Sequence, residues 1–255
     1  MNSIQFVNKA KDVLKHKTIY IMGCFGAPLV NKQVKQRYID AYKYNQGATR
    51  KKKILEAASD VYGFDCVGLI KAILWGWDGN VKEPYGGSKY ASNGVPDIGA
   101  DAMIKKCKDI STDFKKIIPG EVVWKTGHIG IYIGDGLVIE SSPAWTDGVQ
   151  VTCIGTKKGY NSRVWTKHGK LPYVSYKAET PAPQQPKTYR KGQEVILDKT
   201  PVYYASGDKK PTAQLTGRFY IYDGVCVNGK YRITMKAAWC GRKPIAKYVT
   251  AWIGG

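Results

Sequence analysis

The chain has 255 residues, of which 43% are hydrophobic and 24% are charged. This apolar content is enough to fill a packed core, and it excludes a disordered or fibrous class. The formal net charge of +20 favours a polyanionic partner, such as nucleic acid, an anionic cell-wall polymer or an anionic membrane surface.

No stretch approaches the roughly 20 apolar residues that a bilayer span needs, so we expect no stable membrane insertion. Residues 1–8 have neither the basic nor the apolar segment of a secretion signal, which predicts a protein made in the cytoplasm. The six cysteines are widely spaced, without a CxxC pair or a zinc-ligand cluster. This spacing favours reduced thiols and no metal site.

The first half of the chain is expected to be mainly helical. Ser3 is placed to cap the first helix, and Asp65 is placed to cap a later, strongly apolar one. The expected order is a helix at 3–15, an extended segment at 18–28, polar helices within 31–60, a helix at 66–75, a glycine-rich loop at 76–100 and a helix at 99–108.

The pattern changes at the Pro119-Gly120 turn, after which short apolar runs alternate with turn residues. Strands are predicted at 121–124, 128–133, 137–140, 149–154 and 163–165. Helices followed by an antiparallel sheet make residues 1–177 an α+β domain.

A proline-rich linker is predicted at 178–189, followed by a second domain at 190–255. The second domain is rich in tyrosine and tryptophan and is broken by Asp-Gly and Asn-Gly turns, which is typical of a small all-β barrel. Its strands are predicted at 194–197, 202–204, 217–222, 230–234 and 246–252.

Three residues of the first domain form a candidate catalytic set. Cys66 opens an apolar helix, His128 opens a strand, and Glu140 lies on the next strand after a tight turn. Residues 128 and 140 are expected to lie almost opposite each other across the hairpin. Each residue alone is more often structural, but together they supply a nucleophile, a base and an orienting carboxylate. A helix N-terminus and an imidazole are expected to lower the pKa of the thiol.

Four motifs surround these residues: Thr18-x-Tyr20-x-x-Gly23, Phe64-Asp65-Cys66-x-Gly68-Leu69-Ile70, Pro119-Gly120-Glu121-Val122-Val123-Trp124 and Gly127-His128-Ile129-Gly130-Ile131-Tyr132-Ile133-Gly134-Asp135-Gly136. In this order they resemble the motifs of the NlpC/P60 peptidoglycan hydrolases, which are relatives of the CHAP enzymes among the papain-like thiol hydrolases. The resemblance implies that Cys66 is the nucleophile, His128 the base and Glu140 the orienting residue. It also implies that Tyr20 lies near the substrate and the oxyanion, for which the backbone N–H of Cys66 is one donor.

The chain departs from the family at three places. The third catalytic position is commonly His in NlpC/P60 members, whereas CHAP-like members include a carboxylate there, as Glu140 is here. Asp65 is matched, but Val67 replaces the serine that helps it to hold a free L-Ala amine, so stems still attached to muramic acid are also candidate substrates. Residues 27–62 form a longer insertion than is usual, which is either a helical wall of the cleft or a peripheral decoration.

Further cleft residues are proposed from their type. Trp75, Trp77 and Trp145 carry aromatic faces that pack on sugar rings or peptide, and His168 is a candidate to line the cleft. Core packing is the alternative for each tryptophan.

Residues 190–255 resemble bacterial SH3-like cell-wall-binding modules, on the Gly192-x-Glu194-Val195 start, the aromatic strands and the ending Val249-Thr250-Ala251-Trp252-Ile253. A stability or dimerisation domain is the alternative.

Together these features predict a peptidoglycan hydrolase of the phage endolysin type, which acts on the cell wall after release by a membrane-permeabilising partner. We expect it to cut the γ-D-glutamyl–diamino acid amide of the stem peptide without a cofactor. An N-acetylmuramoyl-L-alanine amidase is the alternative enzyme. A non-enzymatic basic binder of wall polymer or nucleic acid is the alternative of another class, although the dispersed basic residues lack a nucleic-acid recognition motif.

Overall fold

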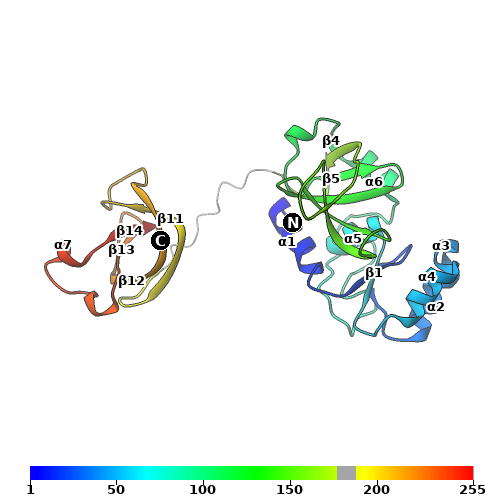
Figure 1. Cartoon of the computed structure of the whole chain (residues 1–255), viewed down its shortest axis with the longest axis horizontal. Helices are drawn as coiled ribbons and strands as arrows, with labels where there is room; N and C mark the ends of the chain where they lie inside the picture. Colours follow the sequence, from blue (N-terminus) through cyan, green and yellow to red (C-terminus); the bar gives the residue numbers. More distant parts are fainter. Residues whose placement is uncertain (177–187, 255) are drawn as a thin grey trace. The chain divides into compact units, whose positions relative to one another are not determined.

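The structure is a computed structural model that describes residues 1–176 and 188–254. The chain divides into two compact units, Met1–Lys177 and Ala178–Gly255 (Figure 1). Of the predicted linker, residues 178–187 lie outside the described residues. No helix in the described ranges has the length and the apolar character to cross a bilayer.

The first unit begins with helix α1, Ser3–Val13, which buries Phe6, Val7 and Ala10 on one face. Its cap is Asn2, one residue before the predicted Ser3. The Asn2 side chain accepts a hydrogen bond from the backbone of Gln5, and the Gln5 side chain reaches back to the Asn2 N–H. This reciprocal pair satisfies two N–H groups that the helix itself leaves free.

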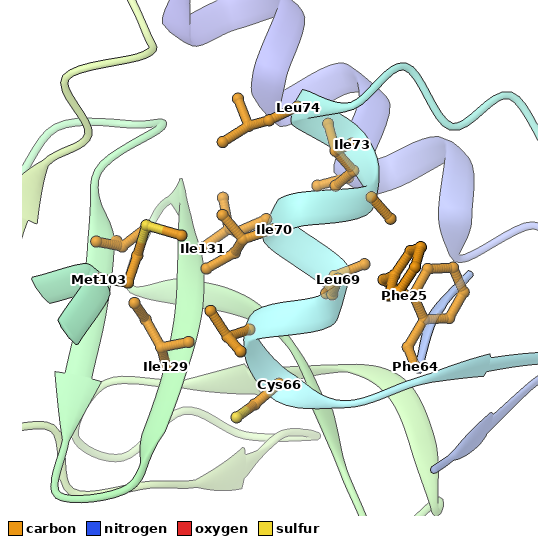
Figure 2. Close-up of a cluster of buried hydrophobic side chains, with 14 of the residues drawn as sticks. Phe25, Phe64, Cys66, Leu69, Ile70, Ile73, Leu74, Met103, Ile129 and Ile131 are labelled. Carbon is orange, nitrogen blue, oxygen red and sulfur yellow. The ribbon is translucent and has the colours of Figure 1, made fainter. Parts of the chain in front are cut away.

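Helix α5, Cys66–Leu74, is the centre of the unit, and all nine of its residues are buried. Figure 2 shows Cys66 on its first turn, with Ile129 and Ile131 on one side of the helix and Phe25 and Phe64 on the other. A helix that is apolar all round is stable only when it is enclosed on every side. The core therefore fixes the position of Cys66.

The insertion, residues 27–62, packs against a small three-stranded sheet. Its strands are β1 (Thr18–Tyr20), β3 (Tyr62–Phe64) and β2 (Phe25–Pro28), in that order. Three helices, α2 (Lys32–Ala41), α3 (Lys43–Gln46) and α4 (Ala48–Glu56), follow β2. Ile39 and Ile54 from these helices form a separate buried cluster with Ile21 and Leu29. The insertion thus has its own small core against this sheet.

The larger sheet has seven strands in the order β4-β10-β5-β6-β7-β8-β9. They are β4 (Lys108–Ser111), β10 (Lys167–Lys170), β5 (Val122–Lys125), β6 (His128–Gly134), β7 (Leu137–Ser142), β8 (Gly148–Cys153) and β9 (Asn161–Ser162), with helix α6 (Ala100–Lys106) and the 3-10 turn Phe114–Lys116 before β5. The predicted α+β arrangement is confirmed. The sequence did not indicate β4 or β10.

The predicted strand at 163–165 is wrong. Strand β9 ends at Ser162 and β10 begins at Lys167. Arg163 still donates its backbone N–H to the Cys153 carbonyl at 3.1 Å, but the segment leaves the ladder afterwards. The alternation of Arg163, Val164 and Trp165 suggested a strand, because the first and third residues do point the same way. Arg163 contacts the side chain of Glu140 and Trp165 stacks on His128, whereas neither continues the strand ladder.

The second unit is a closed barrel of four strands, β11 (Glu194–Tyr203), β12 (Ala213–Val227), β13 (Lys230–Thr234) and β14 (Ala251–Gly254). The strands predicted at 194–197 and 202–204 are one strand, because a bulge between Leu197 and Thr200 interrupts its register without ending it. The strand predicted at 246–252 is wrong in its first half. Residues Ile245–Tyr248 form helix α7 directly after Pro244, and proline near a helix start is common.

Candidate active site

Cys66 lies where helix α5 meets the start of strand β6. Its Sγ is 4.0 Å from the carbonyl oxygen of Gly127, and the backbone N–H of Ile129 interacts with the same sulfur. These two residues flank His128 in the chain, so the thiol sits at the end of β6 where His128 begins.

The thiol does not have the lowered pKa that the sequence suggested. Burial, and next the charge of Asp65, raise the pKa of Cys66 to about 12, while the N–H groups of Ile129 and Val67 lower it by less. A helix N-terminus favours the thiolate, but desolvation has the larger effect here. At neutral pH Cys66 is therefore a thiol, and it needs a base when it attacks.

Asp65 fixes the helix start with both carboxylate oxygens. Oδ1 accepts the Gly68 N–H at 2.5 Å, and Oδ2 accepts the Gly23 N–H at 2.7 Å. Gly68 has to be glycine, because a Cβ there would lie 2.1 Å from the carbonyl oxygen of Cys24. The spacing of the Asp65-Cys66-x-Gly68 motif thus has a steric cause. Both oxygens of the predicted substrate-binding Asp65 are engaged within the protein.

His128 and Glu140 are in direct contact, with 2.5 Å between Nε2 and Oε2. The register of β6 and β7 pairs Ile131 with Ile139, which sets Glu140 opposite Gly130. The expected contact between the imidazole and the carboxylate is therefore confirmed, but residues 128 and 140 are two positions out of line across the hairpin and not almost opposite each other. The carboxylate reaches His128 diagonally, past a residue without a side chain. Because Nε2 is bonded to Glu140, Nδ1 is the ring nitrogen that remains to take a proton from Cys66.

Glu140 is fully buried and has two further donors. The Thr152 hydroxyl is 2.6 Å from Oε1, and the Nε of Arg163 is 2.9 Å from Oε1 and 2.8 Å from Oε2. Burial alone raises the pKa of Glu140, but the hydrogen bonds from His128, Arg163 and Thr152 outweigh it and hold the pKa below its usual value. The carboxylate therefore stays ionised and can stabilise an imidazolium.

Trp165 supports the base from the other side. Its ring stacks on the His128 ring with 5.5 Å between centroids and 12° between planes. Glycine at position 130 leaves room beside this stack, because a Cβ there would lie 2.7 Å from the Val138 side chain and 3.2 Å from the Trp165 indole. Neither Trp165 nor Arg163 was indicated by the sequence as part of the site. The only signal was a buried strand carboxylate at 140, which requires a cation nearby.

Tyr20, at the end of β1, is buried close to the nucleophile. The pKa of its hydroxyl is raised well above the ordinary value, first by burial and then by the neighbouring Cys66 and Asp65. Arg50 of helix α4 donates to the Tyr20 carbonyl at 3.0 Å and to Asp147 at 2.7 Å. The ring of Tyr44 packs edge-on against Tyr20 at 5.8 Å. The insertion thus contacts Tyr20, which lies close enough to Cys66 for their charges to interact.

Asn45 pins the short helix α3 to the loop after Tyr20. Its buried side chain accepts the Met22 N–H at 3.1 Å and donates to the carbonyls of Met22 at 3.0 Å and Tyr38 at 2.9 Å. Tyr42 lies over Gly23, where a Cβ would come within 2.1 Å of its ring. This arrangement places Tyr42 and Tyr44 beside the loop that carries Gly23.

Three of the proposed cleft residues are core residues. Trp75 is 1% exposed and donates its indole N–H to the Val95 carbonyl at 2.9 Å, and Trp77 is also buried, donating to Gly26 at 3.0 Å. His168 is buried between Glu121, which bonds its Nδ1, and the Asp113 carbonyl, 3.1 Å from its Nε2. For Trp75 and Trp77 the core-packing alternative is confirmed, and the proposed cleft position of His168 is wrong, because residue type alone does not distinguish a buried ring from an exposed one.

Trp145 differs from these three. It is 48% exposed, on the loop between β7 and β8, and the Arg163 guanidinium lies 4.7 Å above its ring.

Within the described part of the chain, no group of three or more His, Cys, Asp or Glu side chains is placed to hold a metal ion.

No family model and no curated protein matches this chain. Among solved structures, it is similar to the P60 domain of an antigen from M. avium subspecies paratuberculosis, with 15% identity, 68% of this chain and 98% of that chain covered, and a TM-score of 0.37. It is also similar to the peptidoglycan hydrolase RipB from Mycobacterium tuberculosis, with 14% identity, 68% and 66% covered, and a TM-score of 0.35. At this identity and TM-score, neither similarity shows what this chain does.

Proposed function

We propose that the protein is a peptidoglycan hydrolase of the NlpC/P60 type, which cuts an amide of the stem peptide through a Cys-His-Glu mechanism. The observation that carries this is the bonded pair of His128 and Glu140 at the start of β6, where the Cys66 thiol also lies. A buried carboxylate that orients an imidazole beside a thiol is the arrangement that acyl transfer requires.

In the proposed reaction, the Cys66 Sγ attacks the amide carbonyl while Nδ1 of His128 takes the thiol proton. The tetrahedral oxyanion accepts hydrogen bonds from the Cys66 backbone N–H and the Tyr20 hydroxyl. The imidazolium, stabilised by Glu140, returns the proton to the leaving amine as the C–N bond breaks. Water, deprotonated by His128, then hydrolyses the thioester and frees Cys66.

The bond that we favour is the γ-D-glutamyl–diamino acid amide, as the four motifs imply. A second candidate is the amide between muramic acid and L-alanine. It is favoured by the buried Val67 and by the two internal hydrogen bonds of Asp65, because neither side chain then offers a free polar group to a substrate amine. The amidase substrate is a stem still attached to muramic acid, and such a stem has no free L-alanine amine to be held.

The test is to digest purified peptidoglycan with the wild-type protein and with Cys66→Ala, and to identify the released ends by mass spectrometry. New γ-D-glutamyl carboxyls and free diamino-acid amines, absent with Cys66→Ala, establish the endopeptidase. Muramic lactyl carboxyls and new L-alanine amines establish the amidase instead. If wild type releases nothing from several wall types, the hydrolase proposal fails and a wall-polymer binder takes its place.

The insertion is proposed to bind the substrate through Tyr42 and Tyr44, which are 39% and 45% exposed beside the Gly23 loop. Replacing both by alanine should raise KM more than it lowers kcat, because the Tyr42 ring lies over Gly23 and the Tyr44 ring lies against Tyr20, outside the Cys-His-Glu set. Tyr160→Ala is the matched control, since Tyr160 is 40% exposed in a different loop. An equal change in KM for the control would contradict this role.

The barrel is proposed to be an SH3-like module that binds an anionic wall polymer. A cavity of about 190 Å³ on it is lined mainly by apolar surface from Tyr203, Tyr204 and Leu215 among others. Tethering two binding units raises the effective concentration of one at the ligand of the other. Alanine at Tyr203 and Tyr204 should therefore reduce digestion of intact walls and spare soluble muropeptides, and equal losses on both would refute the targeting role.

An endolysin role adds that the protein acts from the host cytoplasm once the membrane is permeabilised. Expression in a susceptible host should then leave cells intact until a membrane-permeabilising agent is added. Lysis without the agent would contradict this part of the proposal.

A further inference from the structure

The loop between β7 and β8 presents a large aromatic ring to solvent close to the catalytic pair. Its Trp145 is 48% exposed, and the Arg163 guanidinium lies 4.7 Å above the indole. The same guanidinium binds the Glu140 carboxylate and lies 5.8 Å from the ring of Trp165, which stacks on His128. Arg163 therefore contacts two tryptophans, one buried beside the catalytic base and one open to a ligand.

The backbone at Trp145 has a conformation that few side chains adopt. Its φ is +55°, in the left-handed region, where a bulky residue is an outlier. Glycine or asparagine would adopt this conformation at a lower cost. Such outliers persist where the surrounding structure enforces them, and they are concentrated at sites that hold a ligand. The indole is thus displayed in spite of an unfavourable backbone.

Gln150 holds this loop from within. Its buried amide nitrogen lies 2.9 Å from the Ala144 carbonyl and 3.3 Å from the carbonyls of Ser142 and Gly148. Its Oε1 accepts the Thr146 N–H at 3.4 Å. These contacts fix the backbone on both sides of the exposed indole.

The insertion holds the same loop from outside, through helix α4. Arg50 donates to one oxygen of Asp147 at 2.7 Å, and Lys53 donates to the other at 2.9 Å. The side chains of Arg50 and Asp147 are only 12% and 13% exposed, and Arg50 also donates to the Tyr20 carbonyl at 3.0 Å. The loop is therefore tied to the strand that ends beside the nucleophile. A ring that is fixed in advance loses little freedom when a ligand packs on it.

We infer that Trp145 is a stacking platform for the sugar ring of the muramic acid to which the stem peptide is attached. This inference rests on the proposed function for the identity of the substrate. The C–H face of a pyranose ring is apolar and packs on the flat face of an indole, whose polar N–H stays at the edge. Sites for small ligands combine such aromatic surfaces with a few polar groups.

The nucleophile side of the site favours a substrate that still carries its sugar. Both carboxylate oxygens of Asp65 are engaged by the N–H groups of Gly68 and Gly23, and Val67 is apolar. Neither side chain therefore offers a free polar group to the amine of a detached stem. In an attached stem, the lactyl group of muramic acid acylates that amine and joins the sugar directly to L-alanine. The sugar then has to lie close to the cleft, where Trp145 offers an exposed ring.

The experiment compares two substrates that differ only in the sugar. One is an N-acetylmuramoyl tripeptide, and the other is the D-lactyl tripeptide that remains when the sugar is removed. Both contain the two candidate scissile amides, and neither has a free L-alanine amine. Wild type should have an about tenfold higher kcat/KM for the N-acetylmuramoyl tripeptide, which is the factor that one good ring stack supplies.

Trp145→Ala should reduce this ratio of kcat/KM values to about 1, chiefly by raising KM for the sugar-bearing substrate. Loss of the contact with Arg163 affects both substrates alike, so it leaves the ratio unchanged. A wild-type ratio near 1 overturns the inference. So does a Trp145→Ala variant that loses activity equally on both substrates.

Two further variants test the aromatic face itself. Trp145→Tyr keeps a flat ring and should retain most of the ratio, whereas Trp145→Leu keeps only apolar volume and should lose it. Tyr160→Ala is the matched control, because Tyr160 is 40% exposed in another loop, and its ratio should equal that of wild type. A leucine variant with the wild-type ratio, or a Tyr160→Ala ratio near 1, overturns the inference.

Binding to the inactive Cys66→Ala variant separates this inference from the proposed function. By calorimetry, the N-acetylmuramoyl tripeptide should bind more tightly than the D-lactyl tripeptide, and the difference should disappear in Cys66→Ala/Trp145→Ala. If this result is obtained and wild type cleaves no wall, only the proposed function has failed. If wild type cleaves walls and the two ligands bind Cys66→Ala equally, only the inference has failed.

Discussion

The two sides of the candidate site are held in different ways. Cys66 is fixed by local backbone geometry, because Asp65 caps its helix and Gly68 lets the first turn approach the Cys24 carbonyl. His128 is fixed by side chains that are far away in the chain, namely Glu140 and Trp165. The nucleophile side is therefore specified within a few residues, whereas the base side is assembled by the tertiary fold.

The electrostatics follow the same division. On the nucleophile side, no cation among the described residues offsets the burial of Cys66, and the pKa of its thiol rises to about 12. On the base side the buried carboxylate has Arg163 and stays ionised. Arg163 thus stabilises the orienting carboxylate and not the thiolate, so His128 has to remove the thiol proton during attack.

The largest expected effect comes from breaking the base side at Trp165. Trp165→Ala removes a buried ring that stacks on His128, and truncation of a buried aromatic residue costs about 3–5 kcal/mol of unfolding free energy. Activity should fall as well, because His128 loses the surface that fixes its ring plane. Urea unfolding of the full chain measures the effect, with the barrel transition as an internal reference.

Trp165→Phe is the control for this prediction. It keeps an aromatic face under His128 and removes an indole N–H that has no hydrogen-bond partner in the described part of the chain. An unpartnered buried donor is unfavourable, so phenylalanine should recover more than half of the lost stability. If Trp165→Phe is as damaging as Trp165→Ala, the stack on His128 is not what holds the base side.

This difference also explains which parts of the site could be predicted. The start of α5 was predictable, since a capping Asp65, a glycine three residues later and an apolar run are all local signals. His128 and Glu140 were recognisable through the hairpin pattern, although the register placed them two positions out of line. In each case the information lies within about 15 residues of chain.

Arg163 and Trp165 could not be found in this way. The chain has 40 lysine and arginine residues, and nothing near position 163 marks the one that meets a carboxylate 23 positions earlier. The same holds for the tryptophans. Trp75 and Trp145 are equally good cleft candidates by type, and only the packing of α5 and the path of the β7–β8 loop bury one and expose the other.

The next effect in size tests the nucleophile side. Asp65→Ala removes the cap of α5 and leaves the N–H groups of Gly68 and Gly23 without their acceptor. A lost cap costs about 1 kcal/mol and a buried unpaired N–H about 1–3 kcal/mol, so we expect a loss of about 2–3 kcal/mol in the same urea measurement.

Asp65→Asn distinguishes the effect of the helix cap from the effect of the charge of Asp65. Asparagine still accepts from Gly68, but its NH₂ then faces the Gly23 N–H, which loses its acceptor. As a neutral side chain it avoids the cost of burying a charge. Asp65→Asn should therefore be clearly more stable than Asp65→Ala and less stable than wild type. Should it unfold as easily as Asp65→Ala, the charge of Asp65 matters more than its cap, and the nucleophile side is not held by local geometry alone.

The smallest effect concerns Thr152, and its pH dependence is distinctive. Thr152→Val keeps the shape of the side chain and removes the hydrogen bond to Oε1 of Glu140. Hydrogen bonds to charged groups contribute about 1.5–3 kcal/mol, so we expect a loss of about 1.5 kcal/mol of unfolding free energy at pH 7.

The pKa of Glu140 is lower in the folded protein than in the unfolded chain, since the bonds from His128, Arg163 and Thr152 outweigh burial. A carboxylate with a depressed pKa stabilises the fold above its unfolded pKa, and that stabilisation is lost as the pH falls through the folded value. The difference between wild type and Thr152→Val should therefore be constant from pH 7 to about pH 5 and shrink below about pH 4.5, near the ordinary glutamate pKa. Urea unfolding at a series of pH values decides this. A difference that stays constant down to pH 3 would mean that Thr152 contributes packing only, and Glu140 would then depend on His128 and Arg163 to stay charged.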